Sequence, residues 1–148
     1  MPPEKFRVGL VQMSMTSDPD KNLGHAIDRV REAATLGAQI VCLPELFQTQ
    51  YFCQREDASL FDLAEPIPGP TSEKLADVAK QLRIVLIASL FEKRAAGIYH
   101  NTAVVFDADG QNFPVAIDYV NGEGRQTQRV IWPIQLGFMD NARVVTGW

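Results

Sequence analysis

The segment Ile40-Val41-Cys42-Leu43-Pro44-Glu45-Leu46-Phe47 decides the fold of this chain. It opens with four apolar residues, stops at a proline, and places a carboxylate directly after that proline. A short apolar run rich in branched residues is typical of a buried strand. Proline ends such a strand because it has no backbone N–H to donate to the sheet. The segment therefore predicts a buried strand over residues 39–43, with Glu45 just beyond its carboxyl end.

An amphipathic helix is predicted before this strand. Asp18 supplies helix-start chemistry, since a carboxylate at a first turn accepts backbone N–H groups that have no other partner. Gly37 is expected to end the helix, because glycine reaches the left-handed conformation at little cost. Apolar residues recur at three- and four-residue steps between these two points, namely Leu23, Ala26, Ile27, Val30 and Ala34. This spacing predicts one apolar face.

A second amphipathic helix is predicted after a stiff, proline-rich turn at residues 66–70. Thr71 or Ser72 is expected to cap it, and its inner face is formed by Leu75, Val78, Ala79 and Leu82. Further strands are predicted at residues 6–12, 84–90 and 102–107. Strands that alternate with amphipathic helices imply an α/β architecture with crossover connections.

The character of the sequence changes after Gly110. Residues 111–148 contain no lysine, and prolines and turn-forming residues interrupt strand-like pieces at 115–120 and 130–134. We therefore predict one unit over residues 1–110 and an irregular or weakly β tail over residues 111–148.

Composition and charge exclude several classes of partner. The chain has 14 basic and 18 acidic residues, a net charge of −4, and no cluster of lysine or arginine that would predict a nucleic-acid partner. The longest apolar stretch, residues 84–90, is too short to span a bilayer, so no membrane partner is expected. Two cysteines are too few for a disulfide framework, and no secretory signal is recognised, which together predict a cytoplasmic protein.

Glu45 is the candidate catalytic residue. Ligands of open α/β sheets bind beyond the carboxyl ends of the strands, where Glu45 is predicted to lie. Because apolar residues flank it, we expect Glu45 to be shielded from water and suited to act as a general base. The alternative interpretation is a solvated loop glutamate.

The two cysteines are weaker candidates. Cys42 lies within the predicted strand, where a free cysteine is usually a small, inert hydrophobic residue. Cys53 lies in an aromatic loop with no neighbouring base or cation in the sequence, so we expect a structural role or a role in shaping a substrate site.

The remaining polar candidates are assigned structural roles. His25 falls off the apolar face of its helix and is expected to face solvent. His100 is expected to form a structural hydrogen bond. Asp107 and Asp109 lack the other ligands of a calcium loop and are interpreted as a turn. No metal and no cofactor are predicted.

Several segments taken together resemble a known family. They are residues 6–13, 40–47, 51–54, 65–71, 84–91, 99–105 and 107–110, in that order. The set resembles the nitrilase superfamily of carbon–nitrogen hydrolases, and Glu45-Leu46-Phe47 with Tyr51-Phe52-Cys53-Gln54 looks most like its N-carbamoylputrescine amidase branch. The resemblance implies the N-terminal portion of an α-β-β-α sandwich, a small amide or carbamoyl amine as substrate, and a homo-oligomer.

The same resemblance implies a Glu-Lys-Cys triad, of which Glu45 matches the glutamate. The other two members have no match, since the last lysine is Lys93 and no cysteine follows Cys53. The first hypothesis is therefore a truncated amidohydrolase that is inactive alone. The second is a non-catalytic binding or assembly module. A nucleotide-binding protein is disfavoured because no phosphate-binding loop is present.

Overall fold

The structure is a computed structural model. It describes residues 6–53 and 56–108 with their side chains, and the backbone of four strands between residues 115 and 147. In chain order the elements are β1 (Val8–Leu10), α1 (Pro19–Thr35), β2 (Ile40–Cys42), the 3₁₀ helix η1 (Ala58–Leu63), α2 (Pro70–Leu82), β3 (Val85–Ala95), β4 (Ile98–Phe106), β5 (Val115–Val120), β6 (Gln126–Ile131), β7 (Pro133–Met139) and β8 (Ala142–Gly147).

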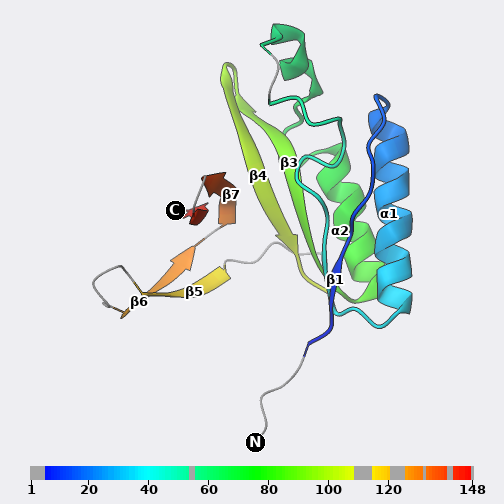
Figure 1. The fold of residues 1–148 in the computed structure, drawn as a ribbon, viewed down its shortest axis with the longest axis vertical. Coiled ribbons are helices and arrows are strands. Elements are labelled where there is room, and N and C mark those ends of the chain that lie inside the picture. Colours follow the sequence, from blue (N-terminus) through cyan, green and yellow to red (C-terminus); the bar gives the residue numbers. More distant parts are fainter. Residues whose placement is uncertain are drawn as a thin grey trace, which may run out of the picture.

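The central sheet has the strand order β1-β2-β3-β4. The first three strands are parallel and are joined by α1 and α2, which lie side by side on one face of the sheet (Figure 1). The predicted α/β architecture with crossover connections is confirmed for these strands. β3 and β4 instead form an antiparallel hairpin, which was not foreseen. Gly97 makes its turn possible with a positive φ of 76°.

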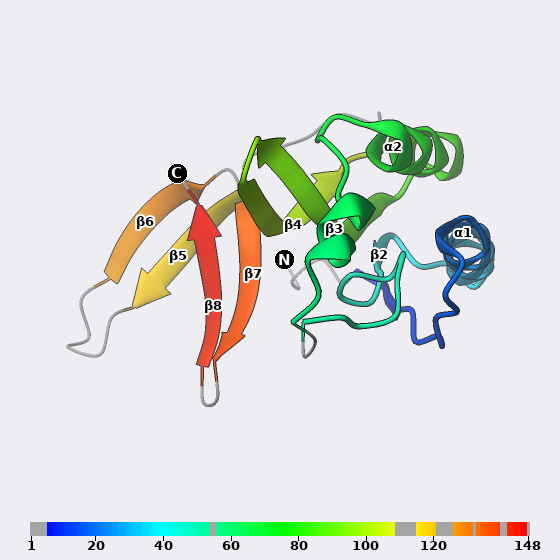
Figure 2. The same ribbon diagram turned by 90° about the horizontal axis from the view of Figure 1, so that it is seen from above.

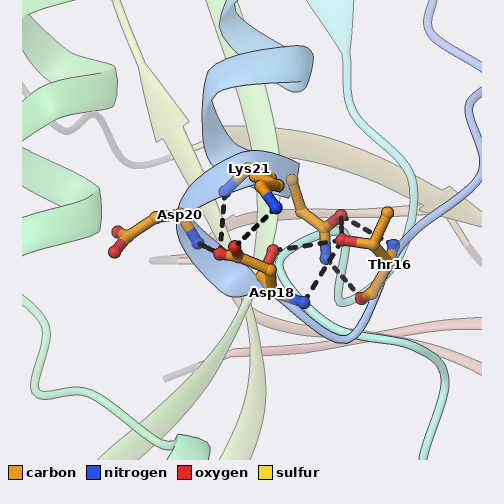
Figure 3. Close-up of polar contacts among 5 residues, drawn as sticks. Thr16, Asp18, Asp20 and Lys21 are labelled. Carbon is orange, nitrogen blue, oxygen red and sulfur yellow. Dashed lines mark hydrogen bonds and ion pairs between the residues drawn. The ribbon is translucent and has the colours of Figure 1, made fainter.

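Helix α1 begins as the sequence predicts. Asp18 is its N-cap, and Oδ1 of Asp18 accepts hydrogen bonds from the backbone N–H groups of Asp20 at 3.1 Å and Lys21 at 3.2 Å (Figure 3). The hydrogen bond from Lys21 N is the main cause that holds the pKa of Asp18 below its usual value. The helix ends just before Gly37, whose φ is 87°. Of the predicted apolar face, Leu23, Ala26 and Val30 are buried.

Helix α2 starts earlier than either predicted cap. Gly69 is the N-cap and Pro70 the first helical residue, a position that suits proline because the N–H it lacks would have no partner there. Ser72 still contributes, since its Oγ accepts from Gly69 N at 2.8 Å and donates to Gly69 O at 2.9 Å. Thr71 hydrogen-bonds Glu65 instead.

The core lies between the sheet and the two helices. Away from the hairpin turn, even-numbered residues of β3 and β4 face the helices and are buried, among them Leu86, Ala88, Leu90, Val104 and Phe106. Odd-numbered residues such as Ser89, Phe91 and Asn101 lie on the opposite face. One helix layer on one sheet is the N-terminal portion of an α-β-β-α sandwich, in agreement with the predicted fold class.

The segment after residue 110 contains more strand than predicted. β5 and β6 form one antiparallel pair and β7 and β8 another, and β7 lies beside β4 (Figure 2). β5 coincides with the strand-like piece predicted at residues 115–120. Asp109 and the turn-former Asn121-Gly122 lie outside the described residues. Among the helices that are described, none is long and apolar enough to cross a membrane.

Candidate functional site

Glu45 lies just beyond the carboxyl end of β2, as predicted from the sequence. Its Oε1 accepts a hydrogen bond of 2.5 Å from Nδ2 of Asn101, a residue of β4 that is 56 positions away in the sequence. This contact brings the first half of the chain together with the β3–β4 hairpin.

Ser89 connects Asn101 back to the loop that carries Glu45. Oγ of Ser89 donates to Oδ1 of Asn101 at 2.6 Å and accepts from the backbone N–H of Leu46 at 3.1 Å. Glu45, Asn101, Ser89 and the Leu46 N–H therefore form a closed chain of hydrogen bonds. Sequence reasoning missed Ser89 and Asn101, because only the pairing of β3 with β4 brings them to Glu45.

Leu46 adopts a backbone conformation that is unusual for its residue type. Its φ is 48°, in the left-handed region, which costs a non-glycine residue about 1–2 kcal/mol. Its side chain is buried, so apolar burial of roughly the same size offsets this cost. Strained backbone of this kind clusters at functional sites, which adds weight to this turn as a site.

The expected shielding of Glu45 from water is wrong. Glu45 is exposed, whereas Leu46 and Phe47 are buried. The left-handed turn at Leu46 sends the two apolar side chains inward and leaves the carboxylate at the surface. Glu45 is therefore fixed by its hydrogen bond to Asn101 rather than by an apolar enclosure.

Gln48 anchors the same loop from its other end. Its Nε2 donates to Glu65 Oε1 at 3.0 Å and to Thr71 Oγ1 at 2.6 Å, and Thr71 also donates its N–H and hydroxyl to Glu65. Burial raises the pKa of Glu65, but the hydrogen bonds from Thr71 and Gln48 and the charge of Lys74 outweigh it, so the pKa lies below its usual value.

A pocket of about 500 Å³ opens beside Asn101. This volume is typical of small-molecule sites. The described residues that line it are Leu46, Phe52, Cys53, Glu56, Asp57, Ala58, Leu60, Phe61, Phe91, Tyr99, His100 and Asn101.

Aromatic rings form one continuous cluster in this pocket. Ring centroids lie 4.8 Å apart between Phe52 and Phe91, 5.8 Å between Phe91 and Tyr99, and 4.5 Å between Phe61 and Tyr99. Lys93 Nζ lies 6.0 Å from the centroid of Tyr99, so this ring already faces one cation. The aromatic content of the loop at residues 47–62 was the only sequence signal for this pocket.

Carboxylates complete the lining. Asp57 accepts from the N–H and the hydroxyl of Ser59, at 2.9 and 2.7 Å, and so caps the start of η1. Glu56 is exposed at the pocket. Among the described lining residues there is neither lysine nor arginine.

The two cysteines occupy different settings. Cys42 is half-buried in β2, and burial raises the pKa of its thiol, which suits an inert residue. Cys53 is exposed and lines the pocket, in keeping with a role in shaping a substrate site. A hydrogen bond with Cys53, followed by the charges of Cys53 and Glu45, raises the pKa of Tyr51, so these three side chains lie near one another.

The histidines differ in their surroundings. His25 is exposed on α1, as predicted. His100 lines the pocket, and its Nδ1 is buried without a hydrogen-bond partner, 3.9 Å from Oε2 of Glu92. This nitrogen therefore does not supply the structural hydrogen bond expected for His100. Glu92 is buried and accepts a 2.5 Å hydrogen bond from Thr102 Oγ1.

No group of three or more metal-ligating side chains occurs among the described residues. The turn predicted at Asp107 and Asp109 extends past residue 108, so its second aspartate lies outside the described residues.

The parallel strands and the helices on one face define an α/β protein, and Glu45 lies beyond the carboxyl end of β2, where open sheets of this class generally bind their ligands. The family model described as carbon-nitrogen hydrolase matches residues 7–145, and the chain belongs to this family. The match extends into residues 111–148, and the division at residue 110 stays a prediction.

Relatives with known names support the resemblance to the nitrilase superfamily. The chain is 42% identical to the omega-amidase of Homo sapiens over 106 residues, which are 71% of this chain and 37% of that protein. It is 34% identical to the N-carbamoylputrescine amidase of Solanum lycopersicum over 134 residues, which are 88% of this chain and 44% of that protein. The chain thus spans well under half the length of these relatives.

Solved structures confirm the fold. The crystal structure of a carbon-nitrogen hydrolase from Helicobacter pylori G27 superposes with a TM-score of 0.69 at 33% identity, over 80% of this chain and 41% of that one. Nit3 of Saccharomyces cerevisiae, a member of the nitrilase superfamily, gives 0.60 at 24% identity, over 75% and 45%. The predicted nitrilase-like fold is confirmed.

Proposed function

We propose that this chain carries the glutamate and the substrate pocket of an amidase site for small amides or N-carbamoyl amines such as N-carbamoylputrescine. The observation that carries the proposal is the contact between Glu45 and Asn101. Asn101 binds the carboxylate on one side and lines the 500 Å³ pocket on the other. Glu45 is thus bound to a residue that lines a cavity of substrate size, beside which a general base is needed.

The lining of the pocket favours a substrate with an ammonium group. Aromatic faces attract cations, and a carboxylate at the pocket adds a charge of the opposite sign. Glu56 and the rings of Phe52, Phe61, Phe91 and Tyr99 supply both features. N-carbamoylputrescine has this chemistry, since its carbamoyl end is the reacting group and its other end is a primary ammonium.

The 148-residue polypeptide does not complete the reaction in this proposal. Amide hydrolysis by a thiol needs an activated nucleophile and a group that stabilises the oxyanion. No lysine follows Lys93 and no cysteine follows Cys53 in the sequence. Cys42 is half-buried within β2, and the exposed Cys53 has no base or cation adjacent to it in the sequence.

The purified chain is therefore expected to bind N-carbamoylputrescine without releasing ammonia. Calorimetry measures binding, and an enzyme-coupled assay of the same samples measures ammonia. Glu56→Gln is expected to weaken binding about two- to fivefold, as for a partly exposed ion pair of about 0.5–1 kcal/mol. Asp62→Asn removes an exposed carboxylate outside the pocket and is the matched control, with unchanged affinity.

Butylurea, which has the same carbamoyl end but no ammonium, is expected to bind less tightly than N-carbamoylputrescine and equally well to the parent chain and to Glu56→Gln. Equal affinity for both ligands, or no saturable binding, would contradict the assigned substrate class. Ammonia release above that of Glu45→Gln would contradict the proposed inactivity, and its loss in Cys53→Ser would assign the thiol to Cys53.

A second candidate function is an assembly module, favoured by the exposed apolar residues of β1. Val8 and Leu10 are 52% and 79% exposed on the face of the sheet away from the helices. Exposed apolar surface next to an edge strand favours association with another chain. A homo-oligomer in the cytoplasm would satisfy both candidate functions.

Light scattering tests this assembly. We expect a mass above the 16.5 kDa of one chain, and a monomer for Leu10→Asp, because a charge on the contact face opposes association. Ile98→Asp changes another exposed apolar residue, on β4 at the opposite edge of the sheet from β1, and is expected to leave the mass unchanged. A monomeric parent chain would rule out the assembly through β1.

A further inference from the structure

In the chain of hydrogen bonds from Leu46 to Glu45, the donor and the acceptor of each bond can be derived by starting at the Leu46 N–H. A backbone N–H only donates, so Ser89 Oγ must accept from Leu46. The single hydroxyl proton of Ser89 is then available to Asn101, and it is donated to Oδ1. The amide of Asn101 is therefore oriented with its NH₂ group toward Glu45.

This direction settles the role of Oε1 of Glu45. An amide NH₂ donates and does not accept, so Oε1 of Glu45 must be the acceptor. Among the described residues, no hydrogen-bond donor contacts Oε2 of Glu45. Within the part of the chain that the structure describes, the two carboxylate oxygens thus differ, since Oε1 accepts a hydrogen bond and Oε2 does not.

We propose that Ser89 and Asn101 are positioning residues for Glu45. The N–H of Leu46 fixes the direction of their hydrogen bonds, and these bonds orient Glu45 with Oε1 occupied and Oε2 presented for proton transfer. The inference rests on the proposed function, in which Glu45 is the general base. It adds two residues from the β3–β4 hairpin to the site and assigns different tasks to the two oxygens of the glutamate.

The location of the residues supports this role. Ser89 and Asn101 lie on the face of the sheet away from the helices, on neighbouring strands, where diagonal side chains are within reach of each other. The chain of hydrogen bonds begins at Leu46 and ends at the adjacent residue, Glu45. Any movement of the hairpin against the β2 loop would therefore break two of its contacts together, so the loop and the hairpin hold each other in register.

The alternative interpretation is that Ser89 and Asn101 only stabilise the attachment of the hairpin. It predicts that substitutions lower the stability of the fold, but that the orientation of Glu45 does not depend on the direction of the hydrogen bonds. The proposal predicts that reversing a donor into an acceptor displaces Glu45 even when the fold is kept.

Carbon-13 NMR of the Glu45 side-chain carboxyl group in the purified chain makes the test. We expect its chemical shift to differ from that of Glu73, an exposed glutamate on α2 that serves as an internal reference. Ser89→Ala and Asn101→Asp are each expected to abolish this difference, and Ser89→Thr, which keeps the hydroxyl, to retain it. A Glu45 signal unchanged by Ser89→Ala and Asn101→Asp, or Ser89→Thr equal to Ser89→Ala, would overturn the proposal.

A measurement on the parent chain keeps the test decisive if a variant fails to fold. Nuclear Overhauser contacts from the side-chain NH₂ of Asn101 are expected to reach the γ protons of Glu45, and contacts to Ser89 alone would overturn the assigned direction. None of these readouts depends on turnover or on ligand binding. Failure of N-carbamoylputrescine to bind would therefore contradict the proposed function and leave this result standing.

Discussion

Phe47→Ala is expected to lower the free energy of unfolding by about 3–5 kcal/mol, the usual cost of removing a large aromatic side chain from a packed core. Phe47 is fully buried, and it is among the largest such side chains of the described residues. It contributes to the core between α1, α2 and the sheet. A loss of this size is a large fraction of the 5–15 kcal/mol that typically holds a domain folded.

Urea unfolding followed by far-ultraviolet circular dichroism measures this loss. Phe61→Ala is the matched control, because Phe61 is 46% exposed and its described ring contacts are with the aromatic cluster of the pocket. It should cost about 0.5–1.5 kcal/mol, the value of an aromatic pair. Equal losses for the two variants would show that Phe47 does not anchor the core.

The elements that could be predicted from the sequence depend on local chemistry. Asp18 caps α1 because a short carboxylate at that position reaches the N–H groups of the next turn, whatever the rest of the chain does. The buried strand at residues 39–43 and the position of Glu45 beyond it follow from an apolar run and a proline. These features need only neighbours in the sequence.

The start of helix α2 could not be predicted from neighbouring residues alone. Both Thr71 and Ser72 have side chains that cap helices, yet the cap is Gly69, because Pro70 already fixes a helical φ. Thr71 is instead used by Glu65, a partner six residues away. A residue type that suits several roles is assigned to one of them by tertiary contacts.

Of the candidate site, Glu45 was predicted from the sequence, whereas Ser89 and Asn101 were missed, because only local sequence patterns could be interpreted. Glu45 follows from its place after β2. Ser89 and Asn101 reach it only because β3 turns back at Gly97 and pairs with β4, and the charged end of β3 gave no apolar pattern to predict that hairpin. The exposure of Glu45 was also missed, since it results from the backbone conformation of one residue, Leu46.

The loop after Glu45 is held at successive residues by different interactions. The N–H of Leu46 binds Ser89, the ring of Phe47 enters the core, and the carbonyl of Gln48 binds Asn22. A polar, an apolar and a second polar contact thus restrain three consecutive residues. This arrangement explains how an exposed glutamate can keep a defined position without burial.

Asn22→Leu is the second substitution with a large expected effect. Asn22 is 2% exposed, and all of its hydrogen bonds are made inside the protein. Its Oδ1 accepts from the N–H and the hydroxyl of Thr16 at 2.8 and 3.0 Å, and its Nδ2 donates to the carbonyl oxygens of Thr16 at 2.8 Å and Gln48 at 2.9 Å. Leucine has a similar size but removes all four of these hydrogen bonds.

Because an intramolecular hydrogen bond contributes about 0.5–1.5 kcal/mol net, and the four of Asn22 are lost here, Asn22→Leu is expected to lower the free energy of unfolding by about 2–4 kcal/mol. His25→Leu makes a polar-to-leucine change at an exposed position of the same helix and should stay within about 0.5 kcal/mol of the parent chain. If the two variants unfold at the same urea concentration, the hydrogen bonds of Asn22 do not stabilise the loop. If only Asn22→Leu is destabilised, the hydrogen bond from Asn22 to the carbonyl of Gln48 helps to hold the loop that carries Glu45. In this variant the Glu45 carboxyl signal is then expected to lose its separation from that of Glu73 as well. Helix α1, which contributes no residue to the pocket lining, would then take part in the site through the backbone that it holds.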